Sequence, residues 1–178
     1  MQGAKDGFVG FVADRFPDGE LSCRLTSFTK RHWEQYQELL PLTRKVSEVF
    51  REYLPECYAL QDAAANRIDS GSVIEGTPFT TITINKDWQT AVHMDQGDLK
   101  SGFGALTLLT AGEFTGGELV FPRYRVAFAF RMQDVLLGDV HEPHGNLPIV
   151  GNWGEFHRIS LVFYLRENML IVCPAARD

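Results

Sequence analysis

Two residues of metal-ligand type, His93 and Asp95, lie two positions apart after a run rich in β-branched residues. In extended backbone this spacing directs both side chains to the same side, so an imidazole and a carboxylate can reach one ion. A mononuclear Fe(II) oxygenase site needs a second histidine, because two histidines and one carboxylate hold the ion and leave its other positions open. His141 and His144 both follow the apolar run DVLLGDV, and both are candidates.

The run HRISLVFYLR alternates between the two faces of a predicted strand. Arg158 and Ser160 share one face, and the other face is apolar: Ile159, Leu161, Phe163 and Leu165. If the apolar face packs against helices, Arg158 points into the interior, where a guanidinium is costly without an anion. A protein carboxylate is one possible partner. The other is a cosubstrate carboxylate, which the planar fork of Arg158 and the hydroxyl of Ser160 would bind.

Helices are expected on the N-terminal side of the half of the chain that contains these candidate site residues. Apolar residues recur at helical spacing from Thr29, a second helix is predicted to begin at Pro41, and a third short one at Pro55. An apolar stripe of this period usually marks a core face, so these helices are expected to support a sheet. A pair of strands separated by a turn at 17–19 is predicted before them.

After residue 76 the pattern changes to strands, in the runs TPFTTITI, TAVHM, SGFGALTLLTAG, GGELVFP, YRVAFAF, QDVLLGDV and FHRISLVFYLR. This order predicts an antiparallel sandwich or barrel backed by helices. We expect one domain over residues 1–178, with helical support at about 27–66 and the core barrel at about 77–166. SGFG and TGGE do not open helices, so they are predicted to be turns or strand glycines rather than phosphate loops.

Composition excludes several classes of protein. The chain has 178 residues, of which 44% are apolar and 22% charged, as in a soluble globular domain, and its apolar runs are too short to span a bilayer. The N-terminus does not resemble a secretory signal, so an intracellular location is expected, nuclear or cytoplasmic. The net charge of -6 argues against a large DNA-coating surface but allows a local basic patch. Three scattered cysteines, Cys23, Cys57 and Cys173, are expected to be thiols.

The order of three features resembles the 2-oxoglutarate and Fe(II)-dependent dioxygenases: H-x-D, a histidine about fifty residues later, and R-x-S about fifteen residues after that histidine. More closely, TITINKDWQTAVHMDQGD, HGN at 144–146 and RISLVFYLR resemble the TET/JBP family, which oxidises the 5-methyl group of pyrimidines in nucleic acid. The resemblance covers about residues 77–166. It implies an α+β, mainly β fold, a double-stranded β-helix (jelly-roll) barrel backed by N-terminal helices.

The resemblance also implies roles for individual residues. The iron ligands would be His93, Asp95 and His144. His144 is preferred to His141 because it begins the HGN motif. The 2-oxoglutarate anchor would be Arg158 with Ser160. The chemistry implied is oxidation of a methyl group by dioxygen, with 2-oxoglutarate converted to succinate.

A methyl group inside a duplex cannot reach such an iron, so the base would have to be flipped into the pocket. The densest basic and aromatic cluster consists of Arg123, Tyr124, Arg125 and Arg131. It is predicted either to grip DNA phosphates or to be a set of solvated strand charges.

Asp98 stands five residues after His93, where TET members carry an asparagine that touches the target base and JBP-like members have Gly-Asp. An ionised carboxylate only accepts hydrogen bonds, and 5-methylcytosine offers its N4 amino group as a donor. The leading prediction is therefore conversion of 5-methylcytosine to 5-hydroxymethylcytosine in DNA. Thymine oxidation to 5-hydroxymethyluracil is the alternative, with His141 as a compensating donor.

Two rival interpretations remain at this level. One is an oxygenase of the same fold that acts on a protein side chain or a small metabolite, which the acidic net charge mildly favours. The other is an inactive barrel that serves as a binding module. We predict no membrane and no protein partner.

Overall fold

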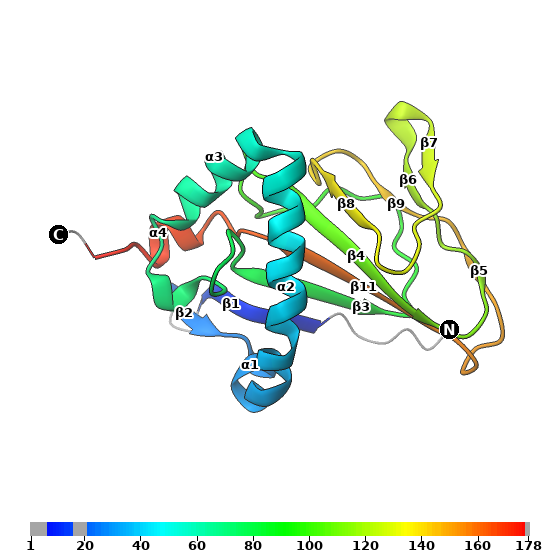
Figure 1. Cartoon of the computed structure of the whole chain (residues 1–178), viewed down its shortest axis with the longest axis horizontal. Helices are drawn as coiled ribbons and strands as arrows, with labels where there is room; N and C mark the ends of the chain where they lie inside the picture. The colour runs from blue at the N-terminus through cyan, green and yellow to red at the C-terminus, as the bar shows by residue number, and fades with distance from the viewer. Residues whose placement is uncertain (1–6, 16–20, 177–178) are drawn as a thin grey trace.

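The structure is a computed structural model of the chain, and it describes residues 7–15 and 21–176. Figure 1 shows a β core with helices on one side. The strands are β1 (Gly7–Arg15), β2 (Leu21–Leu25), β3 (Thr81–Lys86), β4 (Gly104–Ala111), β5 (Thr115–Gly116), β6 (Leu119–Phe121), β7 (Val126–Phe128), β8 (Val135–Gly138), β9 (Gly145–Asn146), β10 (Ile149–Val150) and β11 (His157–Tyr164). The helices are α1 (Ser27–Arg31), α2 (Trp33–Tyr53), α3 (Pro55–Ala65) and α4 (Met169–Val172), with 3-10 turns η1 (Ser70–Ser72) and η2 (Pro122–Tyr124).

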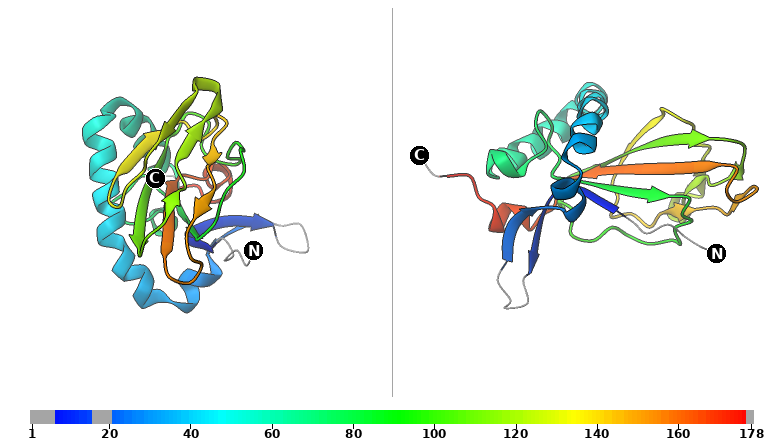
Figure 2. Two further views of the ribbon diagram at one scale, coloured as in Figure 1. Left: turned by 90° about the vertical axis from the view of Figure 1, so that its right-hand side faces the viewer. Right: turned by 90° about the horizontal axis from the view of Figure 1, so that it is seen from below.

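The strands form one large sheet and two small ones. The large sheet has the order β2-β1-β3-β11-β4-β8, and the small sheets are β7-β6-β9 and β10-β5. Every pairing between named strands is antiparallel. Figure 2 shows the layers edge-on, with the helices on one side of the large sheet and the small strands on the other. The predicted mainly β, double-stranded β-helix fold with supporting helices is confirmed.

The main core lies between α2 and the large sheet. Tyr36, Leu40, Val46 and Phe50 of α2 are buried in one cluster with sheet residues: Val9, Ile82, Ala105, Leu161 and Phe163. Each buried Val, Leu, Ile or Phe side chain of this cluster contributes about 1.5–3 kcal/mol when it leaves water. The alternation predicted for the last strand is confirmed, because Leu161 and Phe163 face this core while Arg158 and Ser160 face the opposite side.

The predicted break before Pro41 is wrong, because α2 runs unbroken from Trp33 to Tyr53 with Pro41 inside it. Proline removes one helical hydrogen bond, but buried contacts on both sides of it, at Leu40 and Thr43, hold the helix together. Trp33 and Tyr53, at the two ends of the helix, are exposed rather than part of the core face.

The strand predictions need two corrections. TAVHM is not a strand, and the short strands β9 and β10 were not predicted. The predicted pairing of the first two strands is confirmed by the antiparallel register of β1 and β2, while the turn at 17–19 lies outside the described residues.

The expectation of three free thiols is also wrong, because Cys23 and Cys173 form a disulfide and only Cys57 is free. The two partners are 150 residues apart, and no local spacing could indicate that the fold brings β2 beside the end of α4. Among the described residues, no helix is long and apolar enough to cross a membrane.

Candidate active site

His93, Asp95 and His144 lie close together and line one cavity. One potential ligand atom from each lies within 4.8 Å of the others. His93 Nε2 is 3.1 Å from Asp95 Oδ1, and His144 Nε2 is 3.9 Å from Asp95 Oδ2. Two imidazoles and one carboxylate on one side of a site form the donor set that mononuclear Fe(II) oxygenases use.

Backbone acceptors fix the tautomers of both histidines. His93 Nδ1 is 2.9 Å from the Ala91 carbonyl oxygen, and His144 Nδ1 is 2.8 Å from the Glu142 carbonyl oxygen. A carbonyl oxygen can only accept, so each Nδ1 carries a proton, and the neutral form of each ring offers its Nε2 lone pair to a metal. The donor set therefore fits a divalent cation.

Close approach of two backbone segments brings the histidines together. His93 and His144 exchange two main-chain hydrogen bonds, of 2.8 and 2.9 Å, in an isolated antiparallel bridge. A Cβ at Gly145 would lie 2.9 Å from the Val92 nitrogen, closer than real Cβ contacts. The glycine of the HGN motif is thus needed for the second histidine to approach the first.

Arg158 is 2% exposed and lines the same cavity, of about 340 Å³, as the three metal-ligand side chains. Its Nη2 donates to the Gly117 carbonyl oxygen over 3.0 Å, and burial lowers its pKa, with Glu118 opposing this. No carboxylate within ion-pairing distance is found in the described part of the chain. A buried cation with unused donors facing a cavity, beside the Ser160 hydroxyl, suits an anionic ligand.

Asp87 holds the backbone of this anchor in place. It ends β3 in the left-handed region, at φ 53°, and its Oδ1 accepts the Arg158 backbone N–H over 2.6 Å. Its own N–H donates to the Arg158 carbonyl oxygen over 2.8 Å, and its Oδ2 lies 3.0 Å from His157 Nδ1. The Asp87 carboxylate takes the place of the backbone carbonyl that would accept the Arg158 N–H in a regular β-sheet. The chain can therefore turn toward Trp88 while Asp87 stays hydrogen-bonded to β11.

Asp87→Ala is expected to raise the apparent Michaelis constant for 2-oxoglutarate about 5- to 30-fold, because losing a buried acceptor costs about 1–2 kcal/mol. Asp87→Asn should stay within about threefold of wild type, since asparagine keeps an acceptor oxygen and tolerates a positive φ. Succinate formation against 2-oxoglutarate concentration measures both constants, and thermal melts check folding. Equal behaviour of the two variants would remove Asp87 from the positioning role.

Asp98 and Arg166 form a second polar pair in the cavity. They face each other across an isolated antiparallel bridge, and Asp98 Oδ2 and Arg166 Nε are buried without a hydrogen-bond partner. Burial raises the pKa of Asp98 to about 7, and the charge of Asp95 adds to this, while His141 and Arg166 oppose it. Both residues line the cavity, and buried polar atoms without a partner are rare, so this pair suggests a ligand that presents both a donor and an acceptor.

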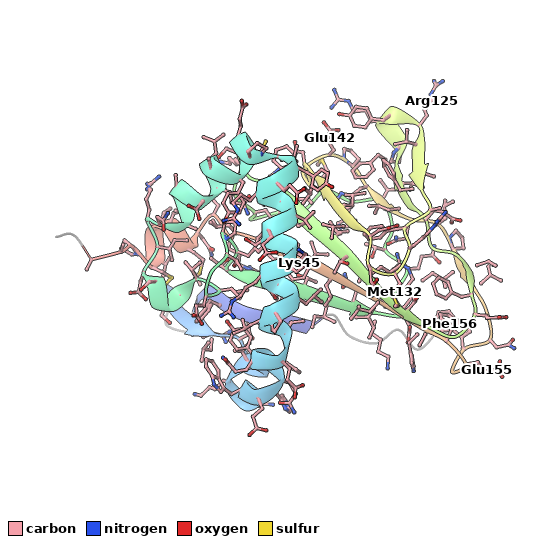
Figure 3. All side chains as sticks on the ribbon, viewed as in Figure 1. Lys45, Arg125, Met132, Glu142, Glu155 and Phe156 are labelled. Atoms are coloured by element: carbon pink, nitrogen blue, oxygen red, sulfur yellow. A yellow bond between two sulfur atoms is a disulfide. The ribbon has the colours of Figure 1, made fainter. Side chains whose placement is uncertain are left out.

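Other predicted residues lie away from this cavity. His141 contacts Asp139, with Nδ1 2.8 Å from Oδ1, and does not join the metal-ligand group. Arg123 forms a 2.8 Å ion pair with Glu142, so its charge already has a partner within the protein. Arg125 lies at the outer tip between β6 and β7 and points away from the molecule (Figure 3). Their roles in substrate binding stay predictions.

The sequence interpretation missed Asp87, Tyr164 and Arg166 as site residues. Tyr164 and Arg166 continue the two-residue alternation that begins at Arg158, so that signal could have identified them. Asp87 carried no such signal, because its role depends on a backbone turn.

Iron(II) enzymes that use 2-oxoglutarate combine a jelly-roll barrel with this kind of open triad and an interior cation, and the chain is an oxygenase of that class. It belongs to the Tet_JBP family, described as the oxygenase domain of the 2OGFeDO superfamily, whose model matches residues 10–167. Members of this superfamily use Fe(II) and 2-oxoglutarate, and the donor set described above fits both.

Several curated proteins are similar in sequence. Thymine dioxygenase JBP1 of Trypanosoma brucei brucei is 36% identical over 165 residues, which are 92% of this chain and 19% of that protein. The bifunctional helicase and thymine dioxygenase JBP2 of Leishmania major is 36% identical over 172 residues, 96% of this chain and 15% of that protein. The chain therefore spans about a fifth or less of the length of these relatives.

One solved structure supports the fold independently. NgTET1 in complex with 5mC DNA superposes with a TM-score of 0.74 over 99% of this chain and 66% of that chain, at 15% sequence identity. At this identity the similarity shows a shared fold.

Proposed function

We propose that this domain hydroxylates the 5-methyl group of a pyrimidine base in DNA, with thymine as the preferred base. The observation that carries the proposal is that one cavity is lined by the metal-ligand triad, by the buried Arg158, and by Asp98 and Arg166, each of which has a buried polar atom without a partner. The relatives at 36% identity, which are named thymine dioxygenases, support the choice of base.

The residues that line the cavity would have separate roles. The Nε2 atoms of His93 and His144 and a carboxylate oxygen of Asp95 would hold Fe(II), while Arg158 and Ser160 would bind a carboxylate of 2-oxoglutarate. Bound together, Fe(II) and 2-oxoglutarate supply the dioxygen-dependent oxidation that converts a methyl group to hydroxymethyl and releases succinate and carbon dioxide. Apolar side chains in the cavity wall exclude water: Leu106, Leu119, Phe130 and Val162.

A base flipped out of the duplex would meet Asp98 and Arg166. Thymine presents N3–H beside O4, so Asp98 can accept from N3–H while Arg166 donates to O4. Arg166 thus supplies the donor that thymine O4 requires beside the Asp98 carboxylate. The sequence predicted this role for His141.

A second candidate base, 5-methylcytosine, has its own support. It presents the N4 amino group beside the N3 acceptor, which the same acid and arginine could bind in shifted register. The structurally similar NgTET1 was solved with 5mC DNA. Asp98, whose pKa burial raises to about 7, could accept from the N3–H of thymine or from the N4 amino group of 5-methylcytosine, so the preference for thymine rests on the relatives.

Nucleoside mass spectrometry tests the proposal. The protein is incubated with Fe(II), 2-oxoglutarate and duplex DNA that contains both thymine and 5-methylcytosine. We expect 5-hydroxymethyluracil as the main product, and Asp98→Ala should reduce it more than it reduces succinate formed without DNA. Dominant 5-hydroxymethylcytosine would overturn the thymine preference, and no hydroxymethyl base in either form would overturn the proposed function.

A further inference from the structure

Two further hollows, on the face built by β1, β2 and α1, adjoin the active-site cavity through shared lining residues. Phe8 and Arg166 line both the cavity and a neighbouring hollow of about 340 Å³. That hollow shares Arg24 and Ser27 with a third one, of about 650 Å³, which reaches Arg31 at the end of α1. In Figure 2 the β1–β2 pair projects away from the large sheet with α1 beside it.

This face is basic although the chain carries a net charge of -6. The residues lining the two outer hollows include Arg24, Lys30, Arg31 and Arg166, and no carboxylate among the described residues lines either hollow. Lys30 and Arg31 are exposed in the last turn of α1, and no ion pair of theirs occurs in the part of the chain that the structure describes.

Several other surface cations have a carboxylate within ion-pairing distance. The pairs are Arg44 with Glu75, Lys45 with Glu48, Lys100 with Glu167, and Arg123 with Glu142. On the basic face, four cations line two adjoining hollows, and the described residues that line these hollows include no carboxylate. Such clustering concentrates positive potential where a polyanion would be attracted.

Aromatic and hydroxyl groups complete the face. Phe8 and Phe28 are 44% and 40% exposed, and the Arg166 guanidinium lies 5.2 Å from the centre of the Phe8 ring. Ser27 adds a hydroxyl between Arg24 and Lys30. Cations and hydroxyls are the groups that bind phosphate oxygens, and exposed rings can pack against sugars and bases.

We propose that the β1–β2–α1 face binds the phosphate backbone of the DNA strand next to the flipped base. The strand would leave the cavity past Phe8 and Arg166 and continue over Ser27 to Lys30 and Arg31. This assigns the sequence-independent part of DNA binding to the N-terminal elements rather than to the β6–β7 tip, where Arg123 is already paired with Glu142. The proposal rests on DNA being the substrate.

Binding of a fluorescein-labelled duplex, followed by anisotropy over a series of salt concentrations, tests this. Lys30→Ala/Arg31→Ala should bind more weakly than wild type, and its log Kd against log salt slope should be shallower by about 1 to 2, since each phosphate contact contributes about 0.9. The matched control is Lys45→Ala/Arg51→Ala on α2, which removes the same charge from the helix that carries Lys45 in Figure 3 and should leave the slope unchanged.

The outcomes separate this inference from the proposed function. An unchanged slope in Lys30→Ala/Arg31→Ala, or an equal change in the control, overturns the basic face even if hydroxymethyl bases are formed. A shallower slope in that variant alone, together with an unchanged Michaelis constant for 2-oxoglutarate, supports the face even if product analysis rejects base oxidation. Wild-type protein that shows no salt-dependent duplex binding overturns it as well.

Discussion

His144→Ala is expected to reduce turnover to background, a loss larger than the roughly 100-fold that removing an outer-shell partner of a metal ligand can cost. The residue supplies a lone pair at Nε2, is 6% exposed, and holds the His93 segment through two main-chain hydrogen bonds. His93→Ala and Asp95→Ala should have the same effect. Succinate formation and bound iron per chain are the two measurements, and both should fall together.

His141→Ala is the matched control, because its ring lies three residues away in sequence and contacts Asp139 instead of the triad. It should retain bound iron and a measurable rate. An inactive His141→Ala beside an active His144→Ala would contradict the ligand assignment.

Arg158→Lys should raise the apparent Michaelis constant for 2-oxoglutarate by about tenfold or more, equivalent to about 1.4 kcal/mol. Lysine keeps the charge but loses the planar fork that pairs with a carboxylate through two donors. It also loses the Nη2 contact to the Gly117 carbonyl oxygen, which orients the guanidinium. The constant is measured from succinate formation at saturating DNA.

Arg51→Lys, on the exposed side of α2, is the control for the same chemical change elsewhere and should leave the constant unchanged. Retention of wild-type affinity in Arg158→Lys would remove this residue from the cosubstrate site. A rise in the Michaelis constant for 2-oxoglutarate with no loss of bound iron would show that Arg158 acts on the cosubstrate and not on the metal.

Local patterns were sufficient for much of the site. The two-residue period of HRISLVFYLR predicted which side chains face the helices, and the cavity indeed contains Arg158 and Ser160. The H-x-D spacing and the HGN motif predicted three side chains that the fold brings within 4.8 Å. The shared face of Arg158 and Ser160 follows from backbone geometry along one strand, whereas the choice of His144 came from the resemblance of the HGN motif to the TET/JBP family.

Long-range pairings were not predictable in the same way. The disulfide between Cys23 and Cys173 and the Asp98–Arg166 bridge join segments that carry no local signal for each other. Pro41 indicated a helix start, yet tertiary packing holds α2 continuous through it. The charge of Arg123 looked available in sequence, and only the structure showed Glu142 beside it.

The sequence by itself determined the chemistry-bearing residue types, the face of β11 on which Arg158 lies, and the mainly β class of the fold. Those features depend on spacing along one segment, which covalent geometry converts directly into side-chain direction. The tertiary structure alone decided that Asp87 holds the Arg158 backbone, that Asp98 and Arg166 line the same cavity as the triad, and that the basic face adjoins it. Each of these joins residues from separate segments, and their proximity depends on how the sheets and helices pack around a shared core.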